Sequence, residues 1–163
     1  MNDSKAVISI GSNLGNKKKN LEIALNLICE FSSIIKESQI YHSEPWGYQS
    51  NHSFLNIGVM VKTNFKPFEL LKKLKNIEIK MGRLPKTKDI YEDRLIDLDI
   101  LIFENYKIKK KELIVPHPKI KERKFSLLIL KDIFGTKYIS DLDNSADEML
   151  MICKDHCNVE VVE

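Results

Sequence analysis

The stretch over residues 94–103 carries an apolar face with period two, and this pattern predicts a β-strand. The apolar side chains at the even positions from 96 to 102 recur with period two, so they share one face of the strand. Asp97 and Asp99 then share the opposite face. Aspartate is disfavoured in strands, and two on one face favour a functional site over the alternative of a solvated outer face.

Other apolar patterns predict the remaining elements. Short apolar runs predict strands over 6–10, 33–41 and 54–61, and apolar residues at helical spacing predict helices over 17–31 and 67–82. A helical stretch over 127–134, a weaker acidic helix over 143–152 and a valine-rich tail complete the chain. The order βαββαβ predicts a ferredoxin-like α+β sandwich, with an antiparallel sheet covered on one face by two helices and with C-terminal additions.

Composition narrows the class of protein. The 163 residues, 43% hydrophobic and 30% charged, are typical of one globular domain, which we expect to span 1–163. No apolar run approaches the 18 residues of a membrane span, and the N-terminus lacks the apolar core of a signal peptide. We therefore expect a cytoplasmic protein. An odd number of cysteines, three, predicts free thiols.

The acidic pair indicates phosphate chemistry. Carboxylates at Asp97 and Asp99, with Cα atoms about 7 Å apart in a strand, suit Mg²⁺, which binds one or two protein carboxylates together with water and substrate phosphates. The chain has only three arginines, Arg83, Arg94 and Arg123, and all of them lie in the segment around this pair. A guanidinium matches phosphate bidentately, which strengthens the interpretation.

Four further residues stand out by their type and position. Asn56, in an apolar strand, suits recognition of a heterocycle with a fixed hydrogen-bonding edge, or is a structural amide bonded to backbone. Glu78 lies on or beside the apolar stripe of its helix, where a carboxylate is unexpected without a partner. His117 lies between two prolines, which suits a fixed phosphate contact or a turn. Trp46, in a Pro/Gly loop, is either part of a lid or a plug on the core.

Five motifs, in order, carry a resemblance to a known family. They are Ile8 to Gly15, Phe54 to Asn56, Gly82-Arg83, Arg94 to Ile100, and Val115 to Pro118 continued through Arg123 and Phe125. Over about residues 6 to 135 the chain resembles the 6-hydroxymethyl-7,8-dihydropterin pyrophosphokinases, folate-pathway enzymes that move a pyrophosphoryl group from ATP to a pterin alcohol.

The resemblance implies a role for each matching residue. Asp97 and Asp99 would bind two Mg²⁺ ions, with Arg83 and Arg94 as further catalytic residues. The implied ATP contacts are Leu71, Lys86, Tyr91, Ile100, His117 and Arg123. The implied pterin contacts are Ser43, Glu44, Trp46, Phe54, Asn56, Phe125 and Asp97, with the two phenylalanines on either side of the ring. Glu78 would support the site or face the substrate.

The resemblance also implies the partners. We expect the small molecules ATP and 6-hydroxymethyl-7,8-dihydropterin, no nucleic acid, no membrane, and a monomer. The chain departs from many members before the acidic strand, where Tyr91-Glu92-Asp93-Arg94 stands in place of Trp-Gly-Pro-Arg. Two alternatives stay open on the sequence alone: a ferredoxin-like RNA-binding module, which the acidic pair and the net charge of only +3 disfavour, and a phosphotransferase for another heterocyclic alcohol.

Overall fold

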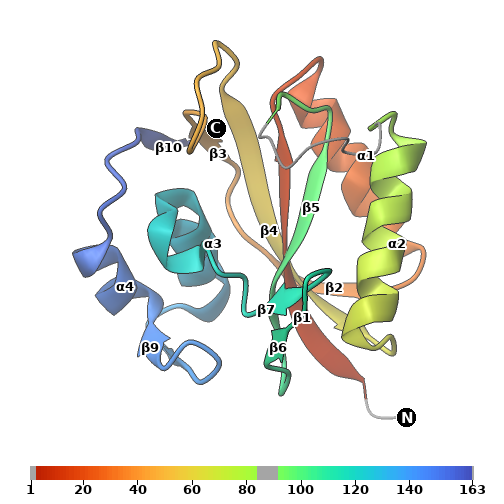
Figure 1. Ribbon diagram of the computed structural model, residues 1–163, viewed down its shortest axis with the longest axis vertical. Coiled ribbons are helices and arrows are strands. Elements are labelled where there is room, and N and C mark those ends of the chain that lie inside the picture. Colours follow the sequence, from red (N-terminus) through yellow and green to blue (C-terminus); the bar gives the residue numbers. More distant parts are fainter. Residues whose placement is uncertain (1–2, 84–91, 163) are drawn as a thin grey trace.

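In the computed structural model, which describes residues 3–83 and 92–162, an antiparallel sheet lies between two pairs of helices (Figure 1). The six strands of this sheet are β1 (Ser4–Ser12), β2 (Ser33–Glu37), β3 (Tyr41–Ser43), β4 (Phe54–Thr63), β5 (Asp97–Phe103) and β10 (Val159–Val161). The helices are α1 (Lys17–Cys29), α2 (Pro67–Lys80), α3 (Lys124–Phe134) and α4 (Ala146–Ile152), with a short 3₁₀ helix at Ile120–Glu122. Two small hairpins pair β6 (Ile108–Lys109) with β7 (Ile114–Val115) and β8 (Tyr138–Ile139) with β9 (Asn144–Ser145).

The strand order across the sheet is β10-β3-β4-β1-β5, and β2 pairs with β4 beyond the end of β3. Helices α1 and α2 cover one face, and α3 and α4 lie on the other (Figure 1). The predictions of an antiparallel sheet and of two helices together on one face are therefore confirmed. The strand expected over 33–41 is divided into β2 and β3, which both pair with β4. Between them, the Ser38 amide donates to the Gly58 carbonyl and the Gly58 amide donates to the Ser38 hydroxyl, both at 2.8 Å. The bond to the Ser38 side chain interrupts the regular ladder with β4.

A β-bulge in β5 corrects one prediction. Val7 of β1 pairs with Ile102, but the next residue, Ile8, pairs with Ile100, so Leu101 is the extra residue on β5. An extra residue moves the side chains beyond it to the other face of the sheet. The prediction that Ile102 shares a face with Ile100 is wrong: Ile102 packs on the α3 side, whereas Ile100 packs on the α1–α2 side.

The two faces of the sheet carry separate apolar clusters. On the α1–α2 side the cluster includes Ile8, Ile10, Leu74, Leu98 and Phe103. On the α3–α4 side it includes Val7, Leu101, Leu127, Leu130 and Met149. The second cluster covers only part of its side of the sheet. Near the start of β5 the side chains on this side are polar, among them Asp97, Asp99 and Ser9 of β1.

Gly58 allows α3 to approach the sheet closely. A Cβ atom at position 58 would lie 2.0 Å from Cγ2 of Ile129, a residue of α3 that is fully buried. No side chain fits at that distance, so glycine at this point of β4 sets how near α3 packs.

The valine-rich tail has a structural role that its sequence did not predict. Val159 and Val161 pair with Ser43 and Tyr41, which adds β10 to the edge of the sheet. Just before it, the Asp155 carboxylate accepts a hydrogen bond from the first amide of α3, that of Lys124, at 2.9 Å.

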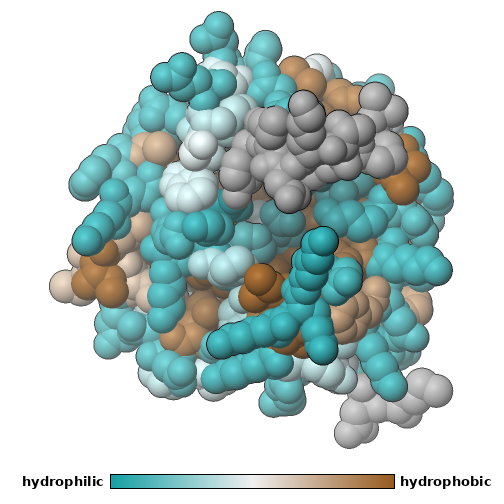
Figure 2. Space-filling model, viewed as in Figure 1, coloured by the Kyte–Doolittle hydropathy of each residue, from teal (hydrophilic) through white to brown (hydrophobic). Residues whose placement is uncertain are grey.

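The surface is mostly hydrophilic on the face shown in Figure 2, with apolar side chains gathered at its left edge over α4, where Met151 and Ile152 are exposed. All three cysteines are free, as predicted. No helix in the described ranges has the length and apolar character needed to cross a membrane.

Candidate active site

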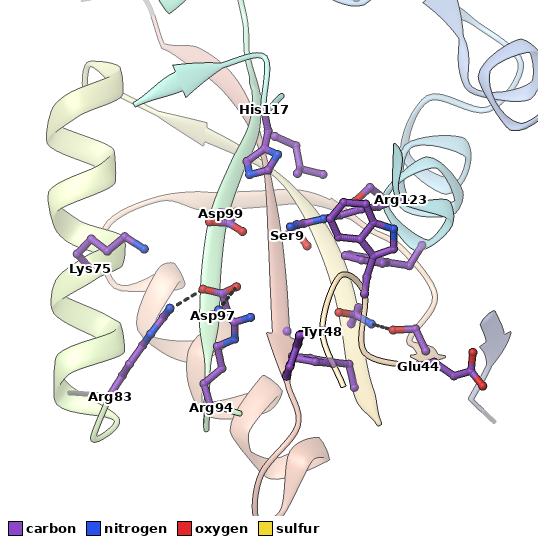
Figure 3. A pocket seen from close by; sticks show the side chains of 18 residues that line it. Ser9, Glu44, Tyr48, Lys75, Arg83, Arg94, Asp97, Asp99, His117 and Arg123 are labelled. Atoms are coloured by element: carbon purple, nitrogen blue, oxygen red, sulfur yellow. Dashed lines mark hydrogen bonds and ion pairs between the residues drawn. The ribbon is translucent and has the colours of Figure 1, made fainter. Parts of the chain in front are cut away.

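Where α3 leaves the sheet uncovered, a cavity of about 170 Å³ opens over β5, β1 and β4 (Figure 3). Many of the predicted site residues line it: Ser43, Glu44, Trp46, Phe54, Asn56, Arg83, Arg94, Asp97, Asp99, His117, Arg123 and Phe125. They come from separate parts of the chain, so the fold brings together the residues that the motifs singled out.

Asp97 and Asp99 project from the same side of β5 into this cavity (Figure 3), as their period-two spacing predicted. Arg83 Nη1 lies 2.5 Å from Asp97 Oδ1, and Arg94 Nη1 lies 3.3 Å from Asp97 Oδ2. Burial alone would raise the pKa of Asp97, but the positive charges of Arg94, Arg83 and Lys75 outweigh it and hold the pKa below its usual range. Asp97 is therefore an ionised carboxylate between two guanidinium groups.

Glu78 anchors Arg83 from the helix side. Its buried carboxylate accepts hydrogen bonds from Arg83 Nη1 at 2.7 Å, from the Leu98 amide at 2.8 Å and from Lys75 Nζ at 3.0 Å. Burial raises the pKa of Glu78, with Lys75 acting in the opposite direction. The sequence predicts a partner for this carboxylate, and the structure provides three donors. Their bonds join α2 to β5 and to Arg83.

His117 presents one ring nitrogen to the cavity. Its amide donates to the Leu101 carbonyl at 2.8 Å, and its Nδ1 accepts the Lys119 amide at 3.1 Å. A neutral imidazole that accepts at Nδ1 carries its proton on Nε2. Burial lowers the pKa of His117, so at neutral pH the ring is an uncharged donor near Asp99 (Figure 3).

Trp46 packs beneath two cationic side chains at the mouth of the cavity. The guanidinium carbon of Arg123 lies 4.9 Å from the centre of the indole ring, and Lys119 Nζ lies 5.7 Å from it. These are cation–π distances. Trp46 therefore forms part of the cavity wall, against Arg123, rather than a plug in either apolar cluster.

Another part of the cavity wall carries two aromatic rings and an amide. Phe54 and Phe125 line it, and Asn56 lies between the strands with its side-chain amide donating to Ser43 Oγ at 2.8 Å. Gly11 faces Asn56: a Cβ atom there would lie 3.1 Å from Asn56 Oδ1. Asn56 thus has a side-chain partner from the fold and lies at the cavity wall, where its amide edge can meet a ring.

The donor chemistry of Asp97 and Asp99 fits Mg²⁺, which prefers carboxylate oxygens and completes its coordination with water and substrate phosphates. In the described parts of the chain, no group of three or more His, Cys, Asp or Glu residues is arranged to hold a metal ion. Oxygens of the substrate and of water would therefore supply the remaining ligands.

Some predicted residues lie elsewhere. Leu71 and Ile100 pack in the apolar cluster on the α1–α2 side and do not line the cavity. Lys86 and Tyr91 lie outside the described residues. The cavity also contains side chains that the sequence did not single out, above all Lys75 and Tyr48. Lys75 precedes Glu78 by three helical residues, and that i,i+3 spacing on the same helix face was the signal that could have identified it.

The sequence of the chain is similar to those of known proteins. The family model for 7,8-dihydro-6-hydroxymethylpterin-pyrophosphokinase (HPPK) matches residues 7–135. The 2-amino-4-hydroxy-6-hydroxymethyldihydropteridine pyrophosphokinase of Bacillus subtilis (strain 168) is 39% identical over 130 residues, covering 78% of this chain and 77% of the relative. The enzyme with the same name from Porphyromonas gingivalis is 37% identical, covering 77% of this chain and 88% of the relative.

Longer relatives match over part of their length. The folate synthesis bifunctional protein of Arabidopsis thaliana is 40% identical over 86% of this chain, which spans 28% of that protein. A crystal structure of HPPK-DHPS in complex with substrates shares the fold, with a TM-score of 0.76 at 18% identity over 93% of this chain, which spans 43% of the solved chain.

These matches favour neither the RNA-binding module nor a phosphotransferase for another alcohol. The family model matches most of the chain. Relatives named as this enzyme are more than one third identical over most of its length. The chain belongs to the 7,8-dihydro-6-hydroxymethylpterin-pyrophosphokinase family and is a pyrophosphokinase of folate biosynthesis.

Proposed function

We propose that the cavity on the α3 side of the sheet carries the pyrophosphokinase reaction, in which MgATP gives its terminal pyrophosphoryl group to the hydroxymethyl oxygen of 6-hydroxymethyl-7,8-dihydropterin. The observation that carries this proposal is the pair Asp97 and Asp99 on one side of β5, facing the cationic side chains that line the same cavity. The products would be the pterin diphosphate and AMP.

The residues at the phosphate end would neutralise and orient charge. Asp97 and Asp99 would bind two Mg²⁺ ions, which supply Lewis-acid stabilisation of the phosphate oxygens. Arg83 and Arg94, already placed on Asp97, can turn their other donors toward phosphate oxygens, and His117 can donate from Nε2. Lys75 and Arg123 add positive charge at the walls of the cavity. Phosphoryl transfer needs such positioning and charge stabilisation more than it needs a covalent intermediate.

The residues at the pterin end would hold the acceptor. Phe54 and Phe125 would sandwich the pterin ring, and Asn56 would bond its amide edge together with the loop that carries Ser43, Glu44 and Trp46. Asp97, at the boundary between the two ends, would lie beside the hydroxymethyl group. That oxygen would then attack the β-phosphorus in line, with AMP as the leaving group.

Other roles rest on the family resemblance alone. Leu71 and Ile100 would line the adenine side, and Lys86 and Tyr91 would contact ATP. We also propose that the fold is ferredoxin-like, which is supported by the strand order: with β2 and β3 counted as the second strand, the sheet runs 2-3-1-4 from β3 to β5. A monomer that binds neither nucleic acid nor membrane remains our expectation.

The direct test is to incubate the purified protein with MgATP and 6-hydroxymethyl-7,8-dihydropterin and to separate the nucleotides by chromatography. AMP that forms only with the pterin present is the expected result. ADP would mean simple phosphoryl transfer, and a folded protein that produces neither nucleotide would contradict the proposal.

A further inference from the structure

Asp93 is the centre of a hydrogen-bonded cluster outside the cavity. Its Oδ1 accepts from Asn13 Nδ2 at 2.6 Å, from Ser50 Oγ at 2.6 Å and from the Tyr48 hydroxyl at 3.1 Å. Its Oδ2 accepts from His52 Nδ1 at 2.6 Å. Four donors on one carboxylate that is only about a quarter exposed are more than a solvated surface residue requires.

The donors come from two loops that are distant in sequence. Asn13 comes directly after β1, whereas Tyr48, Ser50 and His52 belong to the loop between β3 and β4. The cluster is closed by Asn13 itself, because its Nδ2 also donates to the His52 carbonyl at 3.3 Å. Asp93 therefore joins the start of β5 to both loops.

Arg94, the next residue, is held by the same cluster. Its amide donates to Asn13 Oδ1 at 2.7 Å, and its carbonyl accepts the Asn13 amide at 3.1 Å. The Arg94 guanidinium then reaches Asp97 at 3.3 Å and lies 5.7 Å from the centre of the Phe54 ring. Any shift of Asp93 would be passed to Arg94 through this fixed backbone.

Asp93 is also connected to the cavity wall, through Tyr48. Tyr48 lines the cavity, and its loop also contains Glu44 and Trp46. Hydrogen bonding, chiefly from Ser50, holds the pKa of Asp93 at about 2, so the carboxylate is ionised throughout the physiological range and accepts charge-assisted bonds.

We propose that Asp93 is a positioning residue for pterin binding: it fixes the loop between β3 and β4 and the Arg94 backbone relative to each other, and so sets the width of the pterin end of the cavity. This rests on the proposed function, since it assigns Phe54 and the loop to the pterin. Asp93 does not line the cavity, and it acts only through Tyr48, Asn13 and Arg94.

The chain offers a matched control in Asp132 of α3. That carboxylate also accepts a tyrosine hydroxyl, from Tyr41 at 2.7 Å, and a backbone amide, from Gln39 at 2.9 Å, but it lies away from the cavity. Asp132→Ala removes two bonds of the same kinds and Asp93→Ala removes four, and the two sites differ in their connection to the active centre.

The experiment measures steady-state AMP formation for wild type, Asp93→Ala, Asp93→Asn and Asp132→Ala. Asp93→Ala should raise KM for the pterin about tenfold, which is about the effect of losing one to two net hydrogen bonds. KM for ATP should rise by a smaller factor, because the Arg94 backbone keeps its two bonds to Asn13. Asp93→Asn should raise it less, because an amide oxygen can still accept the three bonds made at Oδ1. Asp132→Ala should leave both KM values at the wild-type level.

Trp46, the only tryptophan, gives a second readout that needs no substrate. Acrylamide should quench its fluorescence more readily in Asp93→Ala than in wild type, and to the wild-type extent in Asp132→Ala. If Asp93→Ala does not fold, Asp93→Asn decides the matter by the same two readouts. A wild type without pterin-dependent AMP would mean that the proposed function has failed. An active wild type whose Asp93 variants match Asp132→Ala in KM and quenching would overturn the role of Asp93 alone.

Discussion

The two faces of β5 use neighbouring residues for opposite purposes. Leu98 and Ile100 point toward α1 and α2, where helices cover the sheet and the packing is apolar. Asp97 and Asp99 point to the other side, into the cavity, which is also lined by Phe125 and Ser126 from the start of α3. One strand thus supplies core on one side and chemistry on the other, because its side chains alternate.

We call the side of the sheet covered by α1 and α2 the closed face, and the side that carries the cavity the open face. Because side chains alternate along β5, the residues packed on the closed face determine which residues lie on the open face. The α1–α2 cluster packs against β5 through Leu98 and Ile100, and the side chains of Asp97 and Asp99 take no part in that apolar packing. On this account, changes on the closed face should alter stability, and changes on the open face should alter activity. Substitutions at single residues can break or sharpen that separation, and Glu78, Gly58 and Asp93 do so in decreasing order of expected effect.

Glu78 is the clearest exception, since it is a carboxylate on the closed side. Glu78→Ala should lower the free energy of unfolding by about 3–5 kcal/mol, because it leaves the Arg83 guanidinium and the Leu98 amide without their shared acceptor. Glu78→Gln should lower it less, since an amide oxygen can still accept the Leu98 bond. Urea denaturation measures both values.

A control on the same helix is Glu69→Ala, which removes only an exposed bond to the Lys66 amide. It should lower the free energy of unfolding by about 0.5–1 kcal/mol. Equal losses for Glu69→Ala and Glu78→Ala would show that the buried cluster contributes nothing special.

Gly58 tests how α3 defines the boundary of the cavity. Gly58→Ala should lower the free energy of unfolding by about 1–3 kcal/mol, because the new methyl group collides with Ile129. Adding Ile129→Ala removes Cγ2 and Cγ1 and leaves only Cβ, at 3.2 Å from the new methyl group, so the double variant should lose less stability than the sum of the two single losses. A double variant whose losses simply add would contradict the contact.

The smallest of these three expected effects is the pH dependence of the Asp93 cluster. The folded-state pKa of Asp93, about 2, lies below that of an unfolded aspartate, so its contribution to stability is fully present above about pH 4. The contribution should disappear as the pH falls to the folded-state pKa. The difference in unfolding free energy between wild type and Asp93→Asn, about 1–2 kcal/mol at neutral pH, should therefore shrink steadily between about pH 4 and pH 2. A difference that stays constant over this range would argue against an ionised acceptor in the folded state.

Local patterns predicted the features that local geometry determines. The shared side of Asp97 and Asp99 follows from period two, and the helix over α2 follows from Pro67 and its apolar stripe. Ile102 was misplaced because the bulge at Leu101 depends on register with β1, which no local pattern encodes. The same holds for β10, whose three residues become a strand only by pairing with β3.

The site divides in the same way. Arginines, aspartates and aromatic residues stood out by type and spacing, and most of them line the cavity. The Asp93 cluster did not, because its donors, Asn13, Tyr48, Ser50 and His52, are ordinary loop residues until the fold brings them together. Lys75 was hidden among the many lysines of the chain.

The adjacent residues Leu98 and Asp99 allow the most direct test of the separation between faces. Each is changed alone, to Leu98→Ala and Asp99→Asn, and each variant is measured for unfolding free energy in urea and for kcat at a temperature where it remains folded. Asp99→Asn should lower kcat by about a thousandfold or more, because an amide is a poor ligand for Mg²⁺, and should leave stability near wild type. Leu98→Ala should lose about 2–5 kcal/mol of stability and keep a kcat per folded molecule near wild type. An Asp99→Asn enzyme with normal kcat, or a folded Leu98→Ala enzyme as inactive as Asp99→Asn, would contradict the account.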